Sequence, residues 1–231
     1  MTTGKAMSAE LPMMPGNTNK KDSFTPLILL ALFFLLIFEV IAWDWWRHGP
    51  SAWLDLMILR HTGRALAAHP WVNETVRVAG ILGKSWFLWT LVACGVIFLA
   101  GKKDWRGFSM LLFVVILGSW LVHPLQDWFG RPRPVPGLPG AAGFSFPSGS
   151  AFFAATVYGA LAFLVASHLF KWWVKAVLFM VALAAALLVG MSRLGLRLHW
   201  FTDVLGAYAL ALSWLLLILL IYKKIQKKPR P

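Results

Sequence analysis

The sequence predicts an all-α polytopic membrane protein, with six transmembrane helices in one bundle and interfacial helices between spans one and two. Three observations lead to this fold class. Of the 231 residues, 59% are hydrophobic, more than a soluble domain of this length normally carries. The apolar residues form runs close to the roughly 20 residues that cross a bilayer. Tryptophans gather near the ends of these runs, as in the aromatic belt of a membrane protein.

The six expected spans follow one another after a polar N-terminal segment. Their approximate bounds are 26–46, 83–100, 107–128, 149–170, 174–191 and 204–222. The segment 51–80 is different, because its Leu, Trp and Ala residues are mixed with charged ones such as Asp55 and Arg60. That mixture is typical of helices that lie in the membrane interface.

Charge predicts how the spans are oriented. The formal net charge is +13, and most lysines lie in the two tails and in the connections after the second and fourth spans. With six spans these segments share one side, which the positive-inside rule identifies as the cytoplasm. We therefore expect a multi-pass protein of the cell inner (cytoplasmic) membrane. It would have a disordered cytoplasmic tail over 1–25, a six-helix domain over 26–222 and a basic cytoplasmic tail over 223–231.

The outer side also carries positive charge, although the same rule predicts little there. Arg131 and Arg133 alternate with prolines at the end of the third span. Proline stiffens the loop, and the planar guanidinium group suits phosphate oxygens. The pair is therefore a candidate anion site. The alternative is that both side chains snorkel to lipid headgroups.

A second outer segment opens the fourth span. Ser148 is a predicted N-cap, and Gly149 leaves the backbone open to close approach. Free N–H groups and the helix dipole favour an anion at such a helix start. The alternative is an ordinary capped helix.

The third segment precedes the sixth span. His199 and Asp203 are four residues apart and would share one face of a helix. A carboxylate hydrogen-bonded to one ring nitrogen fixes the tautomer and raises the basicity of the other nitrogen. Arg193, one or two turns earlier, is placed to hold a group under attack. The alternative is a structural His–Asp pair.

Together the three segments resemble the type 2 phosphatidic acid phosphatases, membrane lipid phosphatases related to vanadium haloperoxidases. The signature of that family is a lysine, six residues and Arg-Pro, then Pro-Ser-Gly-His, then Ser-Arg, five residues, His, three residues and Asp. The third part matches fully from Ser192 to Asp203, the first matches at Arg133-Pro134, and the second matches at 147–149. The resemblance covers roughly residues 26–222.

The resemblance implies a phosphohistidine mechanism that needs no cofactor. His199 would be the nucleophile and Asp203 would orient it. The implied phosphate-binding residues are Arg133, Ser148, Gly149 and Arg193, with Arg131 as a secondary candidate. No cluster has metal-ligand spacing, so no metal site is predicted.

The implied partner is a membrane lipid with a phosphate or diphosphate headgroup, bound on the outer or periplasmic face. The class includes phosphatidic acid, phosphatidylglycerophosphate and undecaprenyl diphosphate. A nucleic-acid partner is disfavoured, because the basic residues lie at the ends of apolar runs. A channel or transporter is disfavoured as well, because no pair of broken helices suggests inverted repeats.

Two positions depart from the signature, by natural or engineered replacement. Gln126 stands at the motif lysine and Ser150 at the second-motif histidine. General acid catalysis contributes about 10²–10⁴-fold, and serine has no accessible pKa near neutrality. Three interpretations remain open: a substrate with a better leaving group, such as a polyprenyl diphosphate; His123 as the proton source; or an impaired member that binds lipid phosphate without efficient turnover.

Overall fold

The computed structural model of the chain describes residues 24–136 and 142–226. These residues form eight helices and no strand. The helices are α1 (Thr25–Trp46), α2 (Ser51–Ala68), α3 (Pro70–Ile81), α4 (Ser85–Gly101), α5 (Trp105–Phe129), α6 (Gly149–Ser167), α7 (Trp172–Gly195) and α8 (Phe201–Gln226). The predicted all-α class is confirmed for the described part of the chain.

Five of these helices, α1, α5, α6, α7 and α8, are long and apolar enough to cross a membrane. The predicted second span corresponds to α4, whose 17 residues reach only about 25 Å at about 1.5 Å per residue. Together with α3 it passes the same test, although the two helices meet at a bend of 43°. The described residues therefore hold five candidate spans, or six if the bent pair counts as one.

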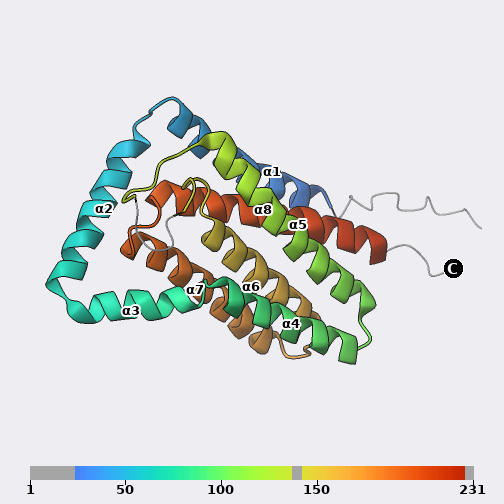
Figure 1. Cartoon of the computed structure of the whole chain (residues 1–231). Helices are drawn as coiled ribbons and strands as arrows, with labels where there is room; N and C mark the ends of the chain where they lie inside the picture. The colour runs from blue at the N-terminus through green and yellow to red at the C-terminus, as the bar shows by residue number, and fades with distance from the viewer. Residues whose placement is uncertain (1–23, 137–141, 227–231) are drawn as a thin grey trace, which may run out of the picture.

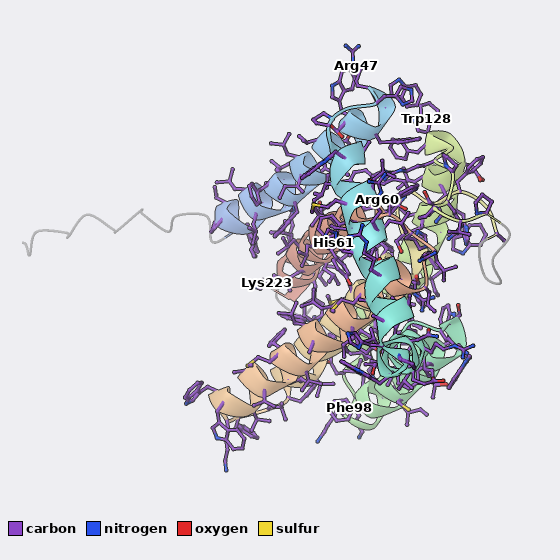
Figure 2. The ribbon with its side chains drawn as sticks, turned by 90° about the vertical axis from the view of Figure 1, so that its left-hand side faces the viewer. Arg47, Arg60, His61, Phe98, Trp128 and Lys223 are labelled. Carbon is purple, nitrogen blue, oxygen red and sulfur yellow. The ribbon has the colours of Figure 1, made fainter. Side chains whose placement is uncertain are left out.

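The centre of the bundle is α6, which contacts α4, α5, α7 and α8. Small residues make this close packing possible. A Cβ atom added at Gly159 would lie 2.7 Å from the Leu215 side chain of α8, so the glycine leaves room for this leucine to pack against α6. Helix α1 lies alongside α8 (Figure 1), while α1 and α7 lie apart from each other (Figure 2).

The segment expected to be interfacial forms two helices. His69 adopts an extended conformation before Pro70, because proline disfavours a helical residue ahead of it. Helix α2 runs across one end of the bundle (Figure 1). Arg60 and His61 lie on its exposed face (Figure 2), whereas Asp55 is buried.

The helix-connecting segments divide between the two ends of the bundle. The α4–α5 connection lies at the end away from α2 (Figure 1), where His168 Nε2 is 3.1 Å from Asp104 Oδ2. At the other end, α5 stops at Gly130 with φ of +60°, a left-handed conformation that suits glycine. Helix α8 continues past the predicted domain limit to Gln226. Most of the two predicted tails lies outside the described residues, and which end faces the cytoplasm stays a prediction.

Candidate active site

The buried Arg131 side chain joins three segments that are distant in sequence. Its Nη1 donates to Asp203 Oδ1 at 2.6 Å and to Thr202 Oγ1 at 2.7 Å. Its Nη2 donates to Asp55 Oδ2 at 2.6 Å. The side chain of Arg131 thus binds one carboxylate at the start of α8 and another on α2. This secondary phosphate-ligand candidate is therefore occupied by contacts within the protein.

Arg133, two residues later, faces the predicted nucleophile. Its Nη1 donates to the Leu198 carbonyl at 2.9 Å and lies 3.1 Å from His199 Nε2. Its Nε and Nη2 donate to the carbonyls of Gly143 and Ala142 at 3.1 and 2.8 Å. One guanidinium group therefore holds the loop after α5 against the loop before α8.

The hydrogen bonds of His199 define its tautomer. Nδ1 lies 2.9 Å from the Ser145 carbonyl oxygen and 3.5 Å from Asp203 Oδ2. A carbonyl oxygen can only accept, so Nδ1 carries the proton and the Nε2 lone pair faces Arg133. The sequence predicts Asp203 as the orienting partner, but the shorter bond goes to Ser145. The carboxylate stays close enough to act on the imidazole through its charge.

Burial lowers the pKa of His199 below its ordinary value of 6.5. The hydrogen bond and charge of Asp203 oppose this shift, and the charge of Arg133 reinforces it. The imidazole is therefore neutral at pH 7, the form that a nucleophile needs. Burial also lowers the pKa of Arg133, against a raising effect from Asp203.

The start of α6 lies against the same loops. Ser148 occupies the N-cap position, but its hydroxyl makes no cap hydrogen bond, contrary to the predicted cap. Instead, its backbone N–H donates to the Asp203 carbonyl at 3.1 Å, and its buried hydroxyl has no hydrogen-bond partner in the described part of the chain. The unsatisfied hydroxyl is available to an incoming ligand.

Gln126, at the motif lysine position, supports this helix start. Its Nε2 donates to the Pro147 carbonyl at 2.9 Å. A Cβ atom added at Gly149 would lie 3.7 Å from the same nitrogen. Gln126 is buried, so its amide fixes the 147–149 segment without bringing a charge.

Arg193 lies on α7 and points toward the α3–α4 bend. Its Nη2 donates to the Gly80 carbonyl at 2.9 Å and would lie 3.0 Å from a Cβ atom added at Gly83. The buried Nε atom has no hydrogen-bond partner within residues 24–136 and 142–226. No hydrogen bond joins Arg193 to His199 or Arg133 in those residues, so its predicted role as a phosphate ligand stays a prediction.

A pocket of about 980 Å³ opens between α4, α5 and α6. Arg133, Gly149 and Ser150 line it, together with His123 and Gln126 of α5. Gly83, beside Arg193, also belongs to its wall. Aromatic residues of the same helices complete the lining: Trp89, Trp120, Phe152 and Phe153. The pocket therefore combines an apolar wall with residues of the first two motifs, as a site for an amphipathic ligand does, whereas His199 is not among its lining residues.

Sequence reasoning missed three contributors to this arrangement. Asp55 belongs to the segment predicted to be interfacial, and its carboxylate among the apolar residues of α2 is a usable signal of a buried role. Thr202 lies between two motif residues and gave no separate signal. Ser145 acts through its backbone carbonyl, which no side-chain pattern reveals.

The chain is similar to known phosphatases over most of its length. Residues 108–227 match the PAP2 superfamily. Phosphatidylglycerophosphatase B of Bacillus subtilis (strain 168) is 36% identical over 205 residues, which cover 87% of this chain and 96% of that protein.

Two crystal structures have similar folds. One is a transmembrane PAP2-type phosphatidylglycerolphosphate phosphatase from Bacillus subtilis, with a TM-score of 0.73 and 33% identity over 88% of this chain and 98% of that one. The other is LpxE of Aquifex aeolicus, with a TM-score of 0.54 and 27% identity over 72% of this chain and 94% of that one.

Proposed function

Because the chain belongs to the PAP2 superfamily, we propose that it is an integral membrane lipid phosphatase that acts through a phosphohistidine intermediate. Its substrate is a lipid with a phosphate or diphosphate headgroup. One observation carries the proposal: a buried, neutral His199 directs its Nε2 lone pair at Arg133, which lines the large pocket. A nucleophile thus lies against a phosphate-binding cation that lines the pocket.

The first chemical step is attack by His199 Nε2 on phosphorus. A P–N bond forms while the bond from phosphorus to the leaving oxygen breaks. The leaving group departs as a phosphate anion from a diphosphate, and an alkoxide leaving group takes a proton from His123. The imidazole gains positive charge, which the Asp203 carboxylate and the Ser145 carbonyl stabilise from the Nδ1 side. Water then attacks phosphorus and the P–N bond breaks. The two protons of the water leave with the inorganic phosphate, and the Nε2 lone pair is restored.

Four groups are proposed to bind the phosphate oxygens: the Arg133 and Arg193 guanidinium groups, the Ser148 hydroxyl and the Gly149 N–H. Two observations support the set. The Ser148 hydroxyl and the Arg193 Nε atom are buried donors without partners in the described residues, and each such group is costly unless a ligand satisfies it. Arg133 already lies against the nucleophile.

The proton for the leaving oxygen limits the choice of substrate. Ser150 lines the pocket at the position where the family has histidine, and it has no proton to give near neutral pH. A departing phosphate needs less protonation than a lipid alkoxide. We therefore place diphosphates, such as undecaprenyl diphosphate, ahead of phosphatidic acid and phosphatidylglycerophosphate. His123, which lines the same pocket, is the proposed proton donor for monoesters.

The alternative proposal is a lipid-phosphate-binding protein without efficient turnover. It is favoured by Gln126, whose amide is committed to the Pro147 carbonyl and contributes no charge to the phosphate. Loss of one charge-assisted bond weakens phosphate binding by about 1–3 kcal/mol. Both proposals place the protein in the cytoplasmic membrane, with its termini in the cytoplasm and the site on the outer or periplasmic face.

An activity panel separates the two proposals. The protein in detergent is given phosphatidic acid, phosphatidylglycerophosphate and undecaprenyl diphosphate, and released phosphate is measured. Turnover that exceeds the background of a His199→Ala preparation supports the enzyme. Binding of these lipids without phosphate release supports the alternative. A phosphoenzyme that is stable in alkali and labile in acid, as a P–N bond is, would identify the intermediate.

A further inference from the structure

Helix α2 sends one carboxylate into the candidate active site. Asp55 is 2% exposed, and Asp203 is the other fully buried carboxylate of the described residues. Asp55 Oδ2 accepts from Arg131 Nη2 at 2.6 Å and from Thr202 Oγ1 at 2.7 Å. Asp55 Oδ1 accepts from the Thr202 backbone N–H at 2.9 Å. Both oxygens are therefore engaged by groups next to Asp203.

Arg131 lies between the two carboxylates and against two aromatic rings. Its guanidinium carbon lies 4.7 Å from the centre of the Trp45 ring and 5.7 Å from that of the Trp200 ring, within the range of cation–π contacts. Trp45 comes from the end of α1, and Trp200 directly follows His199. The cation is thus fixed by aromatic rings and shared by Asp55 and Asp203.

We propose that Asp55 is a positioning residue of the active site, which shares the Arg131 guanidinium with Asp203 and so leaves Asp203 able to act on His199. The proposal rests on the proposed role of His199 as nucleophile. Asp203 Oδ1 binds Arg131, while its Oδ2 accepts from the Trp200 N–H and faces His199 Nδ1. A cation that served Asp203 alone would neutralise more of the charge that the imidazole senses.

The charged groups around His199 predict how its basicity changes when Asp55 loses its charge. Asp203 faces the Nδ1 side from α8, and Arg133 faces Nε2 from the loop after α5. Arg131 lies behind Asp203, and Asp55 lies behind Arg131 on α2. Removing the negative charge of Asp55 strengthens the pull of Arg131 on Asp203 and adds net positive charge to the site. Both effects make the imidazole a weaker base.

A second contact joins α2 to the loop that carries His199. Arg197 adopts a left-handed conformation with φ of +55°, and a Cβ atom added at Gly63 would lie 2.3 Å from its Nη2. The absence of a side chain at Gly63 lets this arginine lie against α2. The helix is therefore docked on the loop at two points, which fits a part in positioning His199.

The decisive variant is Asp55→Asn, which keeps the shape of the side chain and removes its charge. Glu74→Gln is the matched control, because Glu74 is exposed on α3 in a pair with Arg77 at 3.8 Å. The two preparations are compared with the parent in kcat, KM and the pH dependence of kcat/KM. For Asp55→Asn we expect kcat to fall on the order of tenfold at unchanged KM. The acidic limb of the kcat/KM profile should move down by about one pH unit, because the imidazole becomes a weaker base.

A purely structural role for Asp55 would give a different result. The activity of Asp55→Asn would then fall in step with its loss of folded protein, and the acidic limb of the kcat/KM profile would stay at the same pH. A folded Asp55→Asn variant with an unmoved limb, or with a rise in KM alone, overturns the proposal. The double variant Asp55→Asn/Arg131→Gln also removes the cation, so its limb should move back toward that of the parent.

A readout without turnover separates this inference from the proposed function. Histidines are labelled with ¹⁵N, and the titration of His199 is followed by NMR in the parent, Asp55→Asn and Glu74→Gln proteins. If the lipid panel gives no phosphate release, the proposed function fails, yet a lower His199 pKa in Asp55→Asn still supports the inference. If Asp55→Asn does not fold, Arg131→Gln removes the cation that Asp55 and Asp203 share and should raise the His199 pKa. An unshifted His199 in that variant overturns the proposal.

Discussion

Arg133 Nη1 lies 3.1 Å from His199 Nε2, so the nitrogen proposed to attack phosphorus is hydrogen-bonded to the cation proposed to bind the phosphate. An incoming phosphate oxygen must take over this donation before Nε2 is free to attack. The other Arg133 nitrogens bind the carbonyls of Ala142 and Gly143, which keep the side chain in reach of the pocket. Binding of the headgroup and release of the nucleophile are thus coupled through one side chain.

Substitution of His199 tests the nucleophile directly. His199→Gln should reduce phosphate release by about 10³-fold or more, because glutamine cannot form the covalent intermediate. His168→Gln is the control, since His168 pairs with Asp104 at the other end of the bundle, and it should retain parental turnover. Release that survives His199→Gln on every lipid of the panel would reject the phosphohistidine mechanism.

The lowered pKa of His199 predicts how activity depends on pH. The acidic limb of kcat/KM should fall below pH 6.5, the ordinary histidine value, because the buried imidazole stays neutral to lower pH. In Arg133→Gln a neighbouring cation is lost, so the His199 pKa should rise. An NMR titration of His199 in both proteins checks the direction, and a downward shift in Arg133→Gln would contradict it.

The same pKa predicts how stability depends on pH. The unfolded state binds a proton near pH 6.5, whereas the folded state binds it only at lower pH, so stability is lost as the pH falls from about 6.5 toward the folded pKa. Above that window His199 contributes no pH dependence. Thermal unfolding midpoints between pH 7.5 and pH 5.5, chosen as about one unit above and below 6.5, should fall less in His199→Gln than in the parent. Equal losses would argue against the burial effect.

Gln126 is predicted to matter for stability through one hydrogen bond. Gln126→Leu leaves the Pro147 carbonyl without its donor and should destabilise the protein by about 1–3 kcal/mol. Gln126→Lys keeps a donor at this position, so its unfolding midpoint in detergent should stay closer to that of the parent. A Leu variant as stable as the Lys variant would show that the bond has no such role.

Restoring the second-motif histidine tests the missing-acid interpretation. Ser150→His should raise turnover of monoesters more than turnover of diphosphates, with a gain of up to about 10²–10⁴-fold on the alkoxide leaving group. The comparison uses phosphatidic acid and undecaprenyl diphosphate under the same detergent conditions. Equal gains on the two lipids would count against the interpretation. Adding Gln126→Lys should lower KM on both.

His123 is predicted to be the proton donor that remains in the parent protein. His123→Gln should slow monoester turnover by about 10²-fold or more while diphosphate turnover changes little. The contrast between the two substrates serves as an internal control for folding. Parallel losses on both would indicate a structural role for His123 in the pocket wall.

The sequence was sufficient for the fold class, because apolar runs of membrane-spanning length carry a strong signal. The residues 192–203 were equally informative, since their spacing identified the family that the comparisons support. The roles that the resemblance implies for Arg133 and His199 also require the two residues to lie close together, as they do. In each case the signal is local in sequence, or comes from the side of the membrane to which a loop belongs.

The environment of Arg131 could not be predicted in the same way. Asp55 is 76 positions away from it, and no periodicity relates the two residues. Ser148 shows a related limit, because its type favours an N-cap while tertiary contacts leave its hydroxyl without that bond. The Ser145 carbonyl bond to His199 depends on backbone geometry alone. Buried polar networks of this kind are decided by packing, which residue types do not encode.

The docking of α2 through Gly63 and Asp55 makes the site depend on a helix that crosses one end of the bundle rather than running within it. Detergents that lift α2 away would separate Asp55 from Arg131 while the long helices kept their mutual packing. Inactivation should then precede loss of helical circular dichroism during solubilisation. A well-folded but silent preparation would, for this protein, point first to the choice of detergent.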